Sequence, residues 1–312
     1  MKLVKLFSAF AIAGALATGI ANAQDAANRQ TVSDGERALD TWQVQNLMST
    51  HEYYHAAGFN LEEVDALWVS PNGEYAKTAC FFSPSWVMQG VATVRKLYGD
   101  QHVEDSKKNF DQLKAIYPEL ANVDFRSTMV GAEWAMHTST TPVIEVAGDG
   151  KTAKGIWYSP GMGLMPHING KSVAVGGIFF WEKYSGDFVK ENGQWKIWHL
   201  GMYYDFTPSL PDSMTGKLGN GVEASPQAAG QGGAPQGGQG APAQQDNREK
   251  GEQLTAEQIA NGGMLPDPYK YESWSPTRKN AIVPRPPEPY YTFSETFSYA
   301  PYDKNNQYNW KK

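Results

Sequence analysis

The motif H-E-x-x-H at residues 51–55 is the first place where residue type and spacing suggest chemistry. His51 and His55 are four residues apart, so on a helix their imidazoles point to the same side. In metalloproteases two such histidines bind zinc, and the glutamate between them, here Glu52, acts as a general base. A zinc protease is therefore one interpretation of the chain.

A catalytic zinc ion needs a third protein ligand. Where the longer metzincin pattern has that ligand this chain has Leu61, so Glu62, Glu63 or His102 would have to replace it. Residues 24–50 are also too few to form the sheet that precedes the motif helix in such proteases. We therefore keep a zinc metalloprotease only as an alternative, and we assign no metal ligand and no cofactor.

A second group of polar residues lies in a predicted hairpin. The Asn-Gly pair at 192–193 is typical of a tight turn, so residues 178–190 and 195–206 are expected to pair as antiparallel strands. Regular counting from that turn pairs Gly186 with His199. One face would then mix apolar walls with polar groups, as a pocket does: Phe188, Ile197, His199, Tyr184, Glu182 and Tyr203. The other face is broad and apolar, which favours a subunit interface: Trp181, Lys183, Trp198, Leu200, Met202 and Tyr204.

The first helix that would position the motif is well marked. Ser33 and Glu36 have the spacing of a capping box, and Gly58 can end a helix in the left-handed conformation. Between them, apolar residues at helical spacing share one face with His51, whereas Glu52 is turned about 100° away. His51 is therefore expected to point into the core.

Further helices are expected at residues 61–68 and 91–98, the latter ended by Gly99, and β patterns dominate from residue 125 onward. Helices followed by an antiparallel meander predict an α+β fold, with the helices on one face of a curved sheet.

Residues 39–206 resemble the SnoaL-like domain of the nuclear transport factor 2-like superfamily. The resemblance rests on the order of a first helix LMSTHEYYHAAG, a glycine-led helix GVATVRKLYG, a strand MHTSTTPVIEVAGDGKTAKGIW and a final hairpin DFVKENGQWKIWHLGMYYDF. It implies a cone-shaped α+β fold around an apolar pocket, and a homo-oligomer, dimer or trimer, that assembles through the sheet. Members include cofactor-independent dehydratases, isomerases and lyases, among them a lyase of lignin-derived diarylpropanes, and also proteins that only bind.

The resemblance also bears on single residues. His137 matches the histidine that the family places in the pocket from the sheet. The tyrosine and aspartate that its dehydratases carry on the first helix are replaced here by His51 and Ala56, so their mechanism does not transfer directly.

Three histidines are therefore expected to converge on one hydrophobic cavity. His51, His137 and His199, with Tyr184, form the predicted catalytic set. Burial should lower the pKa of these histidines and keep them neutral, so that one can act as a base while a tyrosine holds the proton. The residues predicted to contact the substrate are Tyr54, His55, Trp86, Glu182, Phe188 and Tyr203.

Together with the resemblance, this set predicts a lyase, dehydratase or isomerase that acts on a hydrophobic, aromatic small molecule. The abundance of aromatic residues and the resemblance to the diarylpropane lyase make lignin-derived dimers one candidate. A SnoaL-like protein that binds a small molecule without turnover is the alternative.

Composition divides the chain and suggests its location. Residues 1–23 have the basic start, apolar run and Ala-x-Ala end of a signal peptide, which predicts a periplasmic or secreted protein. The α+β domain is expected at 33–206, a Gly/Gln/Ala/Pro-rich flexible linker at 219–251, and an extended arm rich in proline and aromatic residues at 254–312. The formal net charge of -6 argues against nucleic acid as a partner, and no membrane contact is expected after removal of the signal.

Overall fold

The computed structural model describes residues 29–127, 134–169, 172–209, 264–269, 271–279 and 281–310. The expected signal peptide, residues 1–23, and the expected linker, residues 219–251, lie outside these ranges. Within the described part of the chain, no helix is both long enough and apolar enough to cross a bilayer.

The fold is α+β, as the order of sequence patterns predicts. The helical segments are α2 (Asp34–Ala56), α3 (Asn60–Leu67), α4 (Val91–Val94), η1 (Arg95–Asp100), α5 (Gln101–Lys114), η2 (Pro118–Leu120), η3 (Phe125–Ser127) and η5 (Phe293–Glu295). The strands are β1 (Cys80–Ser83), β2 (Trp86–Gln89), β3 (Trp134–Met136), β4 (Thr140–Val146), β5 (Thr152–Asn169), β6 (Ser172–Glu191), β7 (Gln194–Phe206) and β8 (Met264–Leu265).

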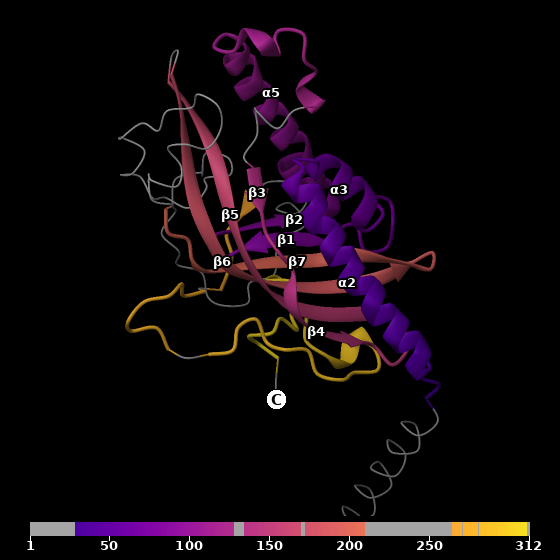
Figure 1. Cartoon of the computed structure of the whole chain (residues 1–312). Helices are drawn as coiled ribbons and strands as arrows, with labels where there is room; N and C mark the ends of the chain where they lie inside the picture. The colour runs from indigo at the N-terminus through magenta and orange to yellow at the C-terminus, as the bar shows by residue number, and fades with distance from the viewer. Residues whose placement is uncertain are drawn as a thin grey trace, which may run out of the picture.

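One curved sheet contains all of these strands. Its order is β3-β5-β6-β7-β1-β2-β8, and β4 pairs with β5 beside β3. The pairs are antiparallel except β1 with β7. Helix α2 lies across one face, where Val44 and Met48 are fully buried in a core that includes Tyr184 and Leu200 (Figure 1). We call this side the helix face of the sheet.

Helix α2 begins and ends as predicted. The Ser33 hydroxyl accepts a hydrogen bond from the Glu36 backbone N–H at 3.2 Å, and the Glu36 carboxylate accepts one from the Ser33 N–H at 2.9 Å. The helix stops at Ala56, and Gly58 follows with φ of 71°. The reciprocal cap satisfies backbone donors that the first turn leaves free.

The predicted helix end at Gly99 is wrong. Helix α4 continues through η1, which is a π-helical turn, directly into α5. A Cβ on Gly99 would come within 3.0 Å of the Leu61 side chain on α3. The glycine therefore allows two helices to pack closely rather than ending one of them.

The predicted hairpin register holds only near the turn. Asn192 and Gly193 have φ of 51° and 78°, and Phe188 pairs with Ile197 as expected. The register then shifts between Phe188 and Asp187, so Asp187 faces His199 and Trp198 has no counterpart. This bulge moves the following β7 side chains to the face opposite to the predicted one.

Residues 264–269, 271–279 and 281–310 fall within the range predicted as an extended arm, and we call them the arm. They run along the face of the sheet opposite to α2, which we call the arm face (Figure 1). Backbone N–H groups of Gly148 and Asp149 donate to the carbonyls of Tyr290 and Tyr291 at 2.9 and 3.0 Å. Aromatic side chains of the arm complete a second core with the sheet: Cys80, Phe82, Val87, Tyr203, Phe297, Tyr299 and Ala300. Of the residues predicted to meet another subunit, Lys183 donates to the Val283 carbonyl of the arm, whereas Leu200 and Met202 belong to the core on the helix face.

Candidate active site

Three imidazoles meet on the helix face of the sheet, and they differ from the predicted three. His51 and His55 come from α2, and His137 follows β3. The ring centroids of His51 and His55 are 6.0 Å apart, and those of His55 and His137 are 5.2 Å apart. His55, predicted only to touch the substrate, lies between the other two.

His51 forms a buried ion pair with Glu63 on α3. Its Nδ1 lies 2.8 Å from the Glu63 Oε1, and the two side chains are 1% and 0% exposed. Burial alone would lower the pKa of His51, but the charge of Glu63 and its hydrogen bond outweigh burial and raise that pKa to about 9. The expectation that burial keeps His51 neutral is therefore wrong: at neutral pH it is an imidazolium.

His55 has the opposite character. Burial lowers its pKa well below the usual value, and the positive charges of His137 and His51 lower it further. Its Nδ1 lies 3.1 Å from the Tyr98 hydroxyl, which donates a hydrogen bond to Glu63 Oε2 at 2.7 Å. His55 and Tyr98 keep part of their surface accessible, whereas His51 and Glu63 are enclosed. The neutral imidazole is therefore the more accessible of the two on α2.

His137 repeats the arrangement of His51 with a partner from the sheet. Its Nδ1 lies 2.7 Å from Glu182 Oε1, and its ring stacks on Phe180 with centroids 4.6 Å apart. Burial opposes the charged form, but the negative charge of Glu182 raises the pKa of His137. The cluster therefore combines an imidazolium at His51, a second imidazole at His137 whose pKa is raised beside a carboxylate, and a neutral imidazole at His55.

Glu52, the central glutamate of the motif, does not turn away from the core as predicted. It is 7% exposed, and its carboxylate accepts a hydrogen bond from the Ser139 hydroxyl at 2.5 Å. Burial raises its pKa, although the charges of His51 and His137 partly offset this effect. Ser139 lies between β3 and β4, and both strands contact α2, so this side of the helix is covered as well.

Tyr184 lies where it was predicted, with its ring edge-on to His51 at a centroid distance of 5.5 Å. The other predicted contact residues differ in placement. Tyr54 and Trp86 are partly exposed and pack on the main core, whereas Phe188 is fully buried within it.

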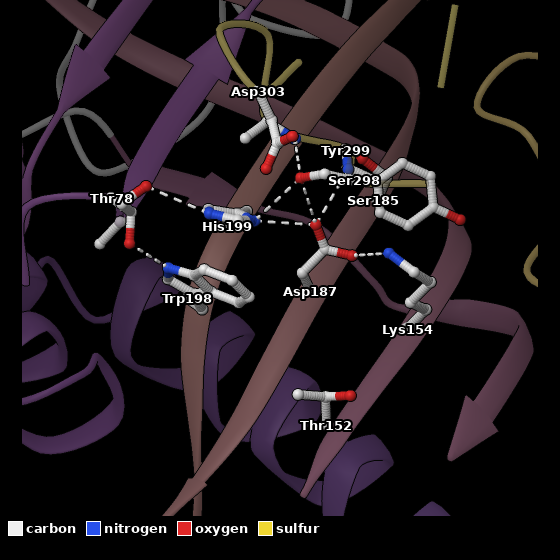
Figure 2. A network of polar contacts seen from close by, with 12 residues as sticks. Thr78, Thr152, Lys154, Ser185, Asp187, Trp198, His199, Ser298, Tyr299 and Asp303 are labelled. Atoms are coloured by element: carbon white, nitrogen blue, oxygen red, sulfur yellow. Dashed lines mark hydrogen bonds and ion pairs between the residues drawn. The ribbon is translucent and has the colours of Figure 1, made fainter. Parts of the chain in front are cut away.

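His199 and Tyr203 do not belong to this cluster, because the β7 bulge places both on the arm face. The His199 Nδ1 lies 2.8 Å from Asp187, and its Nε2 contacts the Thr78 carbonyl at 3.1 Å (Figure 2). The Tyr203 hydroxyl accepts a hydrogen bond from the Gln307 amide of the arm and forms another with the Ser185 hydroxyl. The prediction that His199 shares a cavity with His51 is therefore wrong.

The arm-face network holds the arm to the sheet. Asp187 pairs with the fully buried Lys154 at 2.6 Å and accepts hydrogen bonds from Ser298 and the Tyr299 backbone N–H at 3.2 and 2.9 Å (Figure 2). The Lys154 ammonium also lies 4.3 Å from the centre of the Phe293 ring. Ser298, His199 and Asp187 do not form a catalytic triad, because serine and aspartate both approach the same nitrogen, Nδ1.

Among the residues that the structure describes, no set of three or more His, Cys, Asp or Glu side chains is arranged to hold a metal ion. The Nδ1 atoms of His51 and His55 are instead engaged by Glu63 and Tyr98.

The residue patterns do not predict Glu63 and Tyr98 as partners of the motif histidines; they suggest Glu63 only as a replacement zinc ligand. The position of Glu63 at the fourth residue of α3 is a usable signal, since α3 packs against α2. No sequence signal pointed to Tyr98, because its position depends on the π-helical turn.

The model of the SnoaL-like domain family matches residues 36–201. The chain belongs to the SnoaL-like domain family, as the sequence resemblance indicated. No curated protein matches the chain.

Solved structures with a similar fold share little sequence with this chain. One is an NTF2-like protein with a cystatin-like fold from Novosphingobium aromaticivorans, which is 13% identical over 54% of this chain and 82% of that chain, with a TM-score of 0.30. Another is the hexachlorocyclohexane dehydrochlorinase LinA-type3 from Novosphingobium barchaimii, which is 14% identical over 57% of this chain and 94% of that chain, with a TM-score of 0.35.

Proposed function

We propose that the protein is an exported, cofactor-independent lyase or isomerase that acts by proton transfer on a hydrophobic, aromatic small molecule. The observation that carries the proposal is the separation of pKa values among three neighbouring imidazoles. The pKa of His55 is lowered, while the pKa values of His51 and His137 are raised beside carboxylates. Environments that push the pKa values of adjacent groups apart are how an enzyme separates its base from its acid.

In the proposed elimination, His55 is the general base and His137 the general acid. His55 takes a proton from the substrate, the electron pair of that bond forms the new double bond, and the leaving hydroxyl takes a proton from His137 and departs as water. With their ring centroids 5.2 Å apart, His55 and His137 are close enough to act on the same small substrate.

The two proton transfers would help each other. The positive charge of His137 is one cause of the low pKa of His55. When His137 gives up its proton, that repulsion disappears and His55 holds the substrate proton more firmly. The net charge of the cluster is then the same before and after the reaction, so a buried site gains no uncompensated charge.

As substrate class we propose diarylpropane diols of the kind derived from lignin. His55 would take the proton of the hydroxymethyl group, the carbon–carbon bond would break to release formaldehyde, and the electron pair would form the double bond of a stilbene. The benzylic hydroxyl would leave as water with the proton from His137. The resemblance to the family and the aromatic surroundings of the cluster, such as Phe180 against His137, support this choice.

The test is to incubate the purified chain with such a diol and to measure formaldehyde together with stilbene absorbance. His55→Ala and His137→Ala should each lower kcat by roughly 100-fold or more, as loss of a general acid or base does. Tyr53→Ala is the control, because Tyr53 lies on α2 next to the motif histidines but is 80% exposed. Loss of affinity alone in the histidine variants would instead identify a binding protein without turnover, and the absence of both products would refute the substrate class.

A further inference from the structure

Tyr98 connects the two motif histidines through one carboxylate. His51 Nδ1 lies 2.8 Å from Glu63 Oε1, the Tyr98 hydroxyl donates to Glu63 Oε2 at 2.7 Å, and the Tyr98 oxygen lies 3.1 Å from His55 Nδ1. These contacts form a continuous hydrogen-bonded chain from one histidine to the other. Its members come from α2, α3 and η1.

The direction of each hydrogen bond in this chain follows from its chemistry. A carboxylate can only accept, so Tyr98 must give its single hydroxyl hydrogen to Glu63. Burial and the nearby charge of Glu63 both raise the pKa of Tyr98 well above its usual value, so that hydrogen stays on the phenol. The Tyr98 oxygen can then only accept from His55, which means that the Nδ1 of His55 carries a hydrogen.

A neutral imidazole has one N–H group and one lone pair. With the hydrogen fixed on Nδ1, the lone pair of His55 is on Nε2. We infer that Tyr98 is a positioning residue that holds His55 in the Nδ1–H tautomer, so that Nε2 is the atom that removes the substrate proton. This inference rests on the proposed function, because it assigns the basic atom of the same site.

The local fold explains why this tyrosine reaches the histidine. Tyr98 lies in the π-helical turn η1, and the next residue, Gly99, lets this turn pack directly on Leu61 of α3. A π-helical turn shifts side chains relative to an ordinary helix and is frequent at functional sites. The Tyr98 ring is also held edge-on against Phe81 at a centroid distance of 5.1 Å.

The test is the variant Tyr98→Phe, which removes the hydroxyl and keeps the ring contacts. Nitrogen-15 NMR of the full chain with labelled histidine, assigned with His55→Gln, reports which ring nitrogen carries the hydrogen. Wild type should show His55 as the Nδ1–H tautomer near neutral pH, and Tyr98→Phe should move it towards Nε2–H. The kcat should fall by roughly 10- to 100-fold, as for loss of a partner that orients a histidine, with KM almost unchanged. Tyr53→Phe on the exposed side of α2 is the control and should change neither.

The two readouts separate the inference from the function on which it rests. An unchanged tautomer in Tyr98→Phe would overturn the inference even if the rate fell. A tautomer shift without a loss of kcat would also overturn it, because the tautomer would then not matter for proton removal. A wild-type protein that shows the predicted tautomer but converts no substrate would refute the proposed function, while the hydrogen-bond assignment would stand.

Discussion

Replacing Glu63 by glutamine should remove a pH-dependent part of the stability. Glu63 raises the pKa of His51 to about 9 in the folded protein, against about 6.5 in an unfolded chain. At neutral pH this difference stabilises the fold by about 3 kcal/mol. The contribution is complete below about pH 6.5, where both states bind the proton, and it is lost as the pH rises through 9. Glu63→Gln should therefore be less stable than wild type at neutral pH. Above pH 9 this difference should disappear, because His51 is then neutral in the wild-type protein as well.

The assay is urea unfolding of both proteins at about pH 6 and about pH 10. Between these values wild type should lose about 3 kcal/mol more than Glu63→Gln. Glu62→Gln is a matched control, because Glu62 is the adjacent residue but its side chain is 46% exposed and pairs with Arg126 at the surface; its effect should stay within about 1 kcal/mol. The reasoning fails if Glu63→Gln keeps the pH dependence of wild type, or if the His51 imidazole titrates below pH 7 in wild type.

Three further predictions concern the arm, the sheet and metal dependence. Lys154→Ala leaves Asp187 buried without the lysine cation and should lower the free energy of unfolding by about 3 to 5 kcal/mol. Lys151→Ala, on the exposed turn, is the control and should lower it by less than about 0.5 kcal/mol. Urea unfolding measures both. Gly201→Ala places a Cβ within 2.1 Å of the Phe82 ring and should lower the stability by about 1 to 3 kcal/mol, visible as a lower Tm. Dialysis against a chelator should leave the rate of diol conversion unchanged, because the proposed proton transfers use no metal; a loss of rate that zinc restores would refute metal-independent proton transfer.

The elements near strong local signals were predictable from the sequence. The capping box and the apolar spacing fix α2 between Ser33 and Gly58, and both signals depend only on neighbours within a few residues. The same holds for the Asn192–Gly193 turn and the first pairs beside it. His51 points inward as predicted, because the spacing of buried residues on α2 places it on the covered face.

The wrong predictions concern residues whose positions depend on contacts between segments that are distant in the sequence. The bulge at Trp198 reverses which face of the sheet every later β7 side chain points to, and no residue type there predicts a bulge. Trp198 donates a hydrogen bond from its indole to Thr78 and packs against Phe293 of the arm, so its contacts come from segments far away in sequence. Regular alternation could therefore not show that His199 lies on the arm face.

The charge states of the clustered histidines also could not be predicted from the sequence, because each depends on the residue that the imidazole contacts. Burial was expected to make all of them neutral, yet His51 and His137 each meet a carboxylate whose charge outweighs burial. His55 meets a phenol instead, and a phenol adds no negative charge. The same residue type in the same cluster therefore takes two roles, which the spacing of the motif alone does not distinguish.

The arm also affects the histidine cluster on the other side of the sheet, because strand β6 places side chains on both faces. Glu182 and Tyr184 reach the histidine cluster, whereas Lys183 and Asp187 bond to the arm through the Val283 carbonyl and the Tyr299 backbone N–H. Contacts on one face of a strand fix which residues the other face presents, since side chains alternate. The arm therefore stabilises the register that puts Glu182 beside His137, and with it the raised pKa on which the proposed acid depends.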